Sequence, residues 1–162
     1  MPKPQMLMTS VDNRGIGIFL CVEIRDITSK LYKRRIFMDK VILVGIGGFI
    51  GASLRYLISI GTTKWFGNQF PHGTLIVNIA GGLLIGFIFE LYISTDLITP
   101  NMKLFLTTGI MGGLTTFSTF SYETVTLFNS GNYITGILNT CLNLFLSFGG
   151  VVLGKYIGTK CI

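Results

Sequence analysis

The stretch that decides the fold reads Gly112-Gly113-Leu114-Thr115-Thr116-Phe117-Ser118-Thr119-Phe120-Ser121. It lies inside a mostly apolar run, residues 104–128, that is long enough to cross a membrane. Adjacent glycines and clustered hydroxyls weaken a helix, because glycine is flexible and Ser and Thr side chains compete for backbone hydrogen bonds. Irregular backbone at membrane depth is tolerated only where protein or a water-filled cavity covers it. We therefore expect a helix that breaks within Gly112–Ser121, starting at the two glycines, beside a buried ion site.

The composition is that of an integral membrane protein. Of the 162 residues, 49% are hydrophobic and only 12% are charged, whereas a soluble domain carries about 25% charged residues. Three further apolar runs, residues 41–60, 73–93 and 134–157, are each long enough to span a bilayer as a helix. The sequence predicts an all-α membrane protein, with four transmembrane helices in a domain over residues 38–162.

Residues 1–37 form a basic leader that differs from the remainder. The leader holds seven of the 13 Lys and Arg residues and three of the seven acids, so most of the net charge of +6 belongs to it. That placement gives no argument for nucleic-acid binding, since no basic groove is interleaved with aromatic residues. Its apolar run Gly15–Val22 is too short to span, and charges follow it instead of a cleavage site. We expect the leader to be disordered or not native, with Met38 as the natural start.

Several polar side chains within the apolar runs need partners. An amide at Asn78 either bonds a neighbouring helix or meets a ligand, because an unpaired amide is costly in lipid. The residues Asn139, Asn143 and Ser147 step by four and share one helix face. Arg55 lies near the end of the first run, where it either snorkels to the interface or faces a pore vestibule or a partner helix.

No set of residues suited to covalent catalysis is visible. The single histidine, His72, lacks partner spacing, and we expect it in an interfacial loop beside Trp65, with Thr74 as the cap of the second helix. The three cysteines are far apart, and no phosphate-binding or dinucleotide motif stands in its proper context. An enzyme is therefore not expected.

Each apolar run carries two glycines four residues apart. Such pairs let helix backbones approach closely in lipid. They predict tight helix packing and do not identify a function. The pairs are Gly47/Gly51, Gly82/Gly86, Gly109/Gly113 and Gly150/Gly154.

The remaining chemistry is that of an ion pore. Phe117 and Phe120 lie three apart, and their positive ring edges could meet a small anion, although ordinary packing is the alternative. Carbonyls released at a helix break suit a hard monovalent cation. Two other functions stay open: a small transporter that exports organic cations with Glu123 as its coupling acid, and a membrane assembly factor that transports nothing. The candidate lining is Asn78, Ser118, Thr119, Ser121, Glu123 and the face of Asn139, Asn143 and Ser147.

Three segments resemble the Fluc/CrcB fluoride channels: residues 48–56, residues 73–78, and Gly112–Ser121 followed by Glu123. They occur in the family's order and spacing over about residues 41–158, and the last segment is the most specific. The resemblance implies a fluoride-selective channel in the cell membrane that exports cytoplasmic fluoride passively and reduces its toxicity. It implies an antiparallel, dual-topology homodimer with two fluoride pathways. It also implies a structural Na⁺ held by the backbone carbonyls of Gly112 and Thr115 from each chain.

The resemblance also assigns the fluoride pathway. It places there Asn78, Phe117, Ser118, Thr119, Phe120, Ser121 and Glu123, whereas the fourth helix aligns less firmly. The leader has no counterpart in the family pattern. Its run Lys33-Arg34-Arg35 would favour a cytoplasmic N-terminus under the positive-inside rule and would work against dual topology. This argument supports Met38 as the start.

Overall fold

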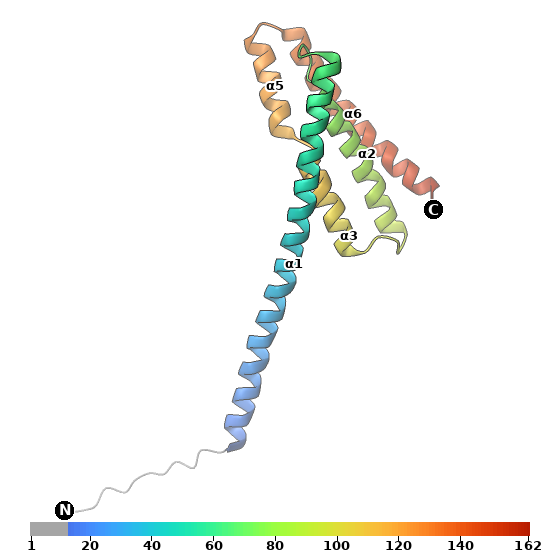
Figure 1. The fold of residues 1–162 in the computed structure, drawn as a ribbon. Helices are drawn as coiled ribbons and strands as arrows, with labels where there is room; N and C mark the ends of the chain where they lie inside the picture. Colours follow the sequence, from blue (N-terminus) through green and yellow to red (C-terminus); the bar gives the residue numbers. More distant parts are fainter. Residues whose placement is uncertain (1–12) are drawn as a thin grey trace, which may run out of the picture. The chain divides into compact units, whose positions relative to one another are not determined.

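The computed structural model describes residues 13–162, and these residues form helices joined by short connections (Figure 1). Contacts divide the chain into two units, Met1–Asp39 and Lys40–Ile162, and the second unit contains the candidate functional site. The elements are α1 (Asn13–Phe66), α2 (His72–Ser94), α3 (Pro100–Leu104), η1 (Phe105–Met111), α4 (Gly112–Leu114), α5 (Phe117–Asn129) and α6 (Tyr133–Lys160).

The leader lies partly outside the described residues, which begin at Asn13. From there the backbone is helical and continues into the apolar part of α1. That the leader is disordered or not native stays a prediction, as does a start at Met38.

Three helices of the described chain are long and apolar enough to cross a membrane: α2, α6 and the Lys30–Phe66 part of α1. They confirm an all-helical, multi-pass membrane protein. The predicted third span, residues 104–128, is instead divided among α3, η1, α4 and α5. Arg55 lies partly buried well inside α1, which continues to Phe66, so both readings of this side chain stay open.

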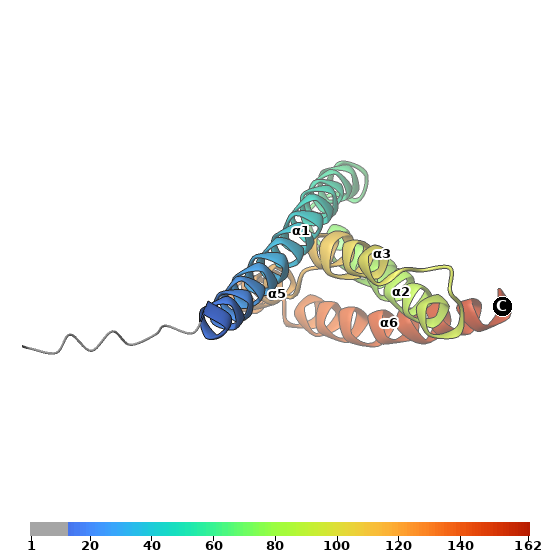
Figure 2. The ribbon, with the colours of Figure 1, turned by 90° about the horizontal axis from the view of Figure 1, so that it is seen from below.

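Helices α2 and α6 lie side by side (Figure 2). A Cβ atom placed on Gly82 of α2 would lie 2.7 Å from the Ser147 carbonyl oxygen, and one on Gly150 of α6 would lie 2.9 Å from the Ile79 carbonyl oxygen. Real side chains do not approach a backbone so closely, and only glycine fits. The predicted tight packing is confirmed, and it pairs the glycines of these two helices with each other's backbone.

A second glycine interface joins α1 to the η1–α4 segment. A Cβ atom on Gly47 would lie 2.8 Å from the Gly109 Cα atom, and one on Gly113 would lie 2.5 Å from the Gly48 carbonyl oxygen. Helix η1 is a π-helix. This form is rare in proteins, and where it occurs it frequently lies near a functional site. The sequence analysis did not predict it.

The helix break lies three residues later than expected. Gly112 and Gly113 remain helical in α4, and the extended backbone is at Thr115 (φ −77°, ψ 157°) and Thr116 (φ −152°, ψ 119°). The expectation of a break at the glycines was therefore wrong, although the break falls within the predicted stretch. The physical reason is that Gly113 is used for close approach to α1, which requires a helix there and no Cβ.

A small apolar cluster lies beside the break. Val77 of α2, Met111 of η1 and Leu114 of α4 are buried together. Many large apolar side chains elsewhere are exposed, as expected of a surface that faces lipid. Leu114 is buried immediately before the break, so the cluster holds the last turn of α4 in place.

Helix α2 lies within one residue of the predicted second span, residues 73–93, but its first turn differs from the prediction. Helix α2 begins at His72 after Pro71, so His72 is a helix residue and not a loop residue. Thr74 does not cap this helix, because it lies inside α2, whose N-cap position is Pro71. Its hydroxyl instead donates to the Glu123 Oε1 atom across to α5 at 2.9 Å. The turn between α5 and α6 contains Gly131 with φ +79°, a backbone conformation that glycine adopts without strain.

Candidate functional site

The break between α4 and α5 is shaped by the side chain of Thr116. Its Oγ1 atom accepts a hydrogen bond from the Thr119 backbone N–H at 3.2 Å, which caps the start of α5. The same hydroxyl donates to the Thr119 Oγ1 atom at 3.0 Å. Thr116 is only 7% exposed, so this cap is built inside the protein.

Backbone carbonyls lose their helical donors at the break, among them the two predicted Na⁺ ligands, Gly112 and Thr115. In a continuous α-helix the Thr116 N–H would donate to the Gly112 carbonyl, and the Thr119 N–H to the Thr115 carbonyl. The Thr116 N–H instead donates to the Asn78 Oδ1 atom at 2.9 Å, and the Thr119 N–H is taken by the cap. The carbonyl oxygens of Gly112 and Thr115 are therefore released from helix pairing.

Asn78 of α2 clamps the break from the side. Its Oδ1 atom accepts from the Thr116 N–H, and its Nδ2 atom donates to the Thr116 carbonyl at 3.2 Å and to the Asn143 Oδ1 atom at 2.9 Å. An amide has two N–H hydrogens, and both are used here. Of the two alternatives for Asn78, the inter-helix bond is the one that the structure contains.

A row of buried amides continues from this clamp through α6 to α5. The Asn143 Nδ2 atom donates to the Asn139 Oδ1 atom at 2.8 Å, and the Asn139 Nδ2 atom donates to the Thr124 Oγ1 atom at 2.9 Å. The Thr124 hydroxyl donates in turn to the Phe120 carbonyl at 2.8 Å. Asn139 is fully buried and Asn143 is 5% exposed. We call the series Thr116, Asn78, Asn143, Asn139 and Thr124 the amide relay.

A groove of about 660 Å³ runs beside the break, between α2, α5 and α6. Phe117 and Phe120 line it, with ring centroids 5.6 Å apart, and Phe117 is 79% exposed. The Ser147 Oγ atom also lines the groove, buried and without a hydrogen-bond partner among the described residues. The groove therefore combines aromatic rings with a hydroxyl that is free to donate.

The three predicted hydroxyls of α5 differ in their surroundings. Ser118 is exposed, with its Oγ atom 3.4 Å from the Thr116 Oγ1 atom. Thr119 is bonded to Thr116 through both its backbone and its hydroxyl. The Ser121 hydroxyl donates to the Phe117 carbonyl of its own helix at 2.9 Å. The Thr119 hydroxyl accepts from Thr116 and so keeps its own hydrogen for an outside acceptor, whereas the Ser121 hydrogen is used within its helix.

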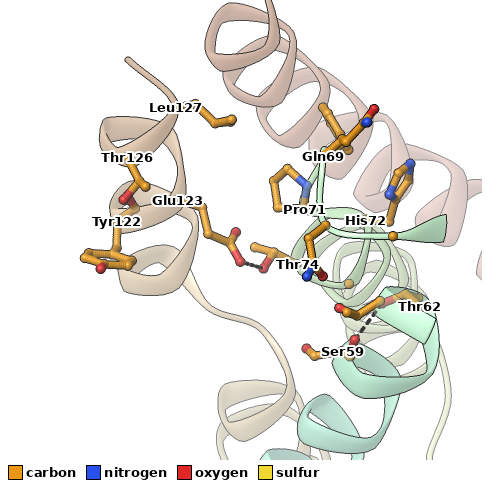
Figure 3. Close-up of a pocket in the computed structure, with 15 residues that line it drawn as sticks. Ser59, Thr62, Gln69, Pro71, His72, Thr74, Tyr122, Glu123, Thr126 and Leu127 are labelled. Carbon is orange, nitrogen blue, oxygen red and sulfur yellow. Dashed lines mark hydrogen bonds between the residues drawn. The ribbon is translucent and has the colours of Figure 1, made fainter. Parts of the chain in front are cut away.

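A second cavity of about 250 Å³ lies where the end of α1 and the start of α2 meet α5 (Figure 3). Glu123 of α5 points toward Thr74 of α2, and its Oε1 atom accepts the Thr74 hydroxyl. The other oxygen, Oε2, is buried without a hydrogen-bond partner among the described residues. The His72 ring stacks on Phe66 at 5.0 Å and meets Phe70 edge-on at 4.9 Å. Glu123 is thus an ionisable group in the wall of a cavity beside α5.

A comparison with protein families identifies the family of the chain. Residues 42–155 match the family model described as CrcB-like protein, camphor resistance (CrcB). The chain belongs to the CrcB family. This membership confirms the resemblance carried by Gly112–Ser121 and the two shorter segments before it.

Curated relatives in this family share much of the sequence. The chain is 60% identical over 124 residues to a Clostridium novyi protein named fluoride-specific ion channel FluC, across 75% of this chain and 97% of the relative. A Clostridium perfringens protein of the same name is 63% identical over 121 residues, across 73% and 94%. One from Ruminiclostridium cellulolyticum is 49% identical over 118 residues, across 73% and 91%.

Sequence reasoning missed three threonines that the structure brings into the site. Thr116 caps the break, Thr124 ends the amide relay, and Thr74 holds the Glu123 carboxylate. A weak indication of Thr124 was present in the sequence, because it is a hydroxyl residue in the same apolar run, residues 104–128, as the expected break. The bond between Thr74 and Glu123 joins residues 49 positions apart, and no local pattern indicates it.

Proposed function

We propose that this chain is a fluoride-specific ion channel of the cell membrane, which lets cytoplasmic fluoride leave passively and so reduces its toxicity. The observation that carries the proposal is the break at Thr115–Thr116, where released carbonyls and a helix N-terminus adjoin. Relatives up to 63% identical are named as fluoride-specific channels, which supports it.

The break offers opposite partial charges to two ions. The last carbonyls of α4 carry partial negative charge, whereas the N-terminus of α5 carries partial positive charge. Broken membrane helices use these ends for cations and anions respectively. The groove beside the α5 terminus adds the edges of Phe117 and Phe120, which are also positive. A small anion is therefore the favoured occupant on the α5 side.

In the proposed pathway, fluoride exchanges its water shell for protein donors along α5. Selectivity follows because an ion without such contacts is very costly to bury. Asn78 serves mainly by holding the wall of the pathway, since its amide reaches an anion only by giving up an existing bond. The proposed pathway residues are Asn78, Phe117, Ser118, Thr119, Phe120, Ser121 and Glu123.

The donor set at the break fits a structural Na⁺. The carbonyl oxygens of Gly112 and Thr115 are neutral, hard ligands that have lost their helical donors. Bound there, Na⁺ would supply a fixed positive charge and would not be transported. These two carbonyls alone are few ligands for a hard cation, and two chains related by a two-fold axis would offer four of them.

The same reasoning supports a homodimer. Phe117 is 79% exposed although it lines the groove, so the wall of the groove is incomplete in one chain. A second copy in antiparallel orientation would cover this face and bring the released carbonyls of both chains together. We propose this dual-topology dimer, with four spans in each chain when α3 to α5 are counted as one broken span.

The experiment is fluoride efflux from liposomes that contain the purified protein, followed with a fluoride electrode. We expect fluoride release above that from empty liposomes, and chloride release no faster than from empty liposomes. No fluoride release would refute the channel and leave the assembly factor. Release of a preloaded organic cation, with Glu123 required, would indicate the transporter instead.

A further inference from the structure

A series of hydrogen bonds runs in one direction along the amide relay, beside the return bond from the Asn78 Nδ2 atom to the Thr116 carbonyl. Starting from Thr116, each member donates to the next: the Thr116 N–H to Asn78, Asn78 to Asn143, Asn143 to Asn139, and Asn139 to Thr124. An amide side chain presents an acceptor on one side and donors on the other. Turning over one amide would therefore face donor with donor, and the Thr116 N–H, which can only donate, fixes the direction of the series at its first end. The Asn143 Nδ2 atom also donates to the Asn139 backbone carbonyl at 3.0 Å, which holds Asn143 in the same orientation.

The two ends of the relay agree on this direction. At the first end, the backbone of Thr116 offers an N–H and a carbonyl side by side, and Asn78 matches both. At the other end, the single hydroxyl hydrogen of Thr124 goes to the Phe120 carbonyl, so Thr124 accepts from Asn139. Asn139 is fully buried, and its Nδ2 atom would lack this acceptor if the Thr124 hydroxyl were removed.

We propose that Thr124 is a positioning residue for the Gly112 carbonyl. By accepting from Asn139 it holds that amide with its Oδ1 atom toward Asn143, and so supports the bonds that keep the Thr116 N–H on Asn78 and away from Gly112. Hydrogen bonds in a buried chain polarise one another, so loss of the last acceptor weakens every earlier link. A freed Thr116 N–H returns to the Gly112 carbonyl, which then no longer faces a cation. The inference rests on the proposed Na⁺ site for its functional consequence.

The test compares threonine variants of purified full-length protein. Thr124→Val keeps the shape of the side chain and removes the acceptor, whereas Thr124→Ser keeps the hydroxyl. Thr126→Val is the matched control, because the Thr126 hydroxyl also donates to the carbonyl four residues earlier, that of Tyr122, but receives no amide from α6 among the described contacts. Thermal unfolding is followed in detergent as Na⁺ replaces N-methylglucamine at constant ionic strength.

We expect the Na⁺ concentration that gives half of the stabilisation to rise about five- to tenfold in Thr124→Val, on the order of one lost hydrogen bond. It should stay within about twofold of the wild type in Thr124→Ser and Thr126→Val. A uniform loss of stability in Thr124→Val with an unchanged Na⁺ midpoint overturns the proposal, because that is the result of ordinary packing. If Thr124→Val does not fold, Thr124→Ala is measured against the same two outcomes.

Hydrogen exchange of the Thr116 amide separates this inference from the proposed function. A wild type that shows no Na⁺ dependence would refute the cation site, and the exchange measurement would then decide the relay alone. We expect the exchange rate at Thr116 to change at least fivefold in Thr124→Val and to stay at the wild-type value in Thr124→Ser. Equal rates in Thr124→Val and wild type would refute the relay.

Discussion

Replacing Asn78 by leucine should loosen the helix break without removing apolar packing. Leucine has a similar volume and fills the same space, but it loses three hydrogen bonds: two to the backbone of Thr116 and one to Asn143. Thr116 is 7% exposed and Asn143 is 5% exposed, so water does not readily replace the lost partner. The variant therefore leaves polar groups of the break unpaired inside the protein.

The size of the effect follows from these contacts. Inter-helix hydrogen bonds in membrane proteins average about 0.6 kcal/mol, so three contribute about 2 kcal/mol. An unsatisfied buried group adds about 1–3 kcal/mol, partly offset where the Thr116 N–H returns to the Gly112 carbonyl. We expect the free energy of unfolding to fall by about 2–4 kcal/mol, with a folded dimer and reduced fluoride efflux.

The assay is equilibrium unfolding in lipid micelles together with liposome efflux. Asn101→Leu, at an exposed position of α3, is the matched control and should leave both quantities unchanged. An unfolding free energy of Asn78→Leu within about 0.5 kcal/mol of the wild type, with wild-type efflux, would refute the clamp and the role assigned to Asn78.

Three further predictions address the pathway, the packing and the acid. Phe117→Ile should fold normally and slow fluoride efflux at least tenfold, whereas Phe145→Ile on the exposed face of α6 should not; equal efflux in both excludes a role for the ring edge. Gly150→Ala should lower the free energy of unfolding by about 1–3 kcal/mol, because its Cβ atom meets the Ile79 carbonyl. The adjacent Gly149→Ala meets nothing within 4 Å and should be neutral or slightly stabilising; the reverse order contradicts the glycine interface. Glu123→Gln keeps a side-chain oxygen for Thr74, and it should reduce but not abolish fluoride efflux from the same liposomes. Complete loss of efflux in a variant that still folds would indicate that Glu123 is a coupling acid.

The sequence predicted the spans and the small-residue packing because both depend on local pattern. Apolar runs of about 20 residues and glycines four apart are visible without knowledge of the fold, and α2 begins and ends within one residue of the predicted bounds, residues 73–93. The shared face of Asn139, Asn143 and Ser147 was also found, since helical periodicity alone places these residues together. The structure confirms that all three turn inward at polar contacts or at the groove.

The exact position of the break could not be predicted, because tertiary contacts decide it. Glycine weakens an isolated helix, but Gly113 has a neighbour, α1, that needs a bare backbone there. Thr116 leaves the helix because Asn78, 38 positions earlier, captures its N–H. The same holds for Thr74, which has the chemistry of a cap but bonds Glu123 instead. Local propensity predicted the stretch in which the helix breaks, and contacts with residues distant in sequence determine the residue at which it breaks.

The two glycine interfaces have a consequence for how the protein moves. In each one, backbone touches backbone: α2 against α6, and α1 against the η1–α4 segment. Such contacts leave no long side chain to change rotamer, so each pair of elements behaves as a stiff body. The Asn78–Thr116 and Asn139–Thr124 bonds tie the α2–α6 body to the break and to α5. The break and α5 are therefore anchored at three places, Thr116, Thr124 and Glu123, and any bend at Thr115–Thr116 has to break one of these bonds.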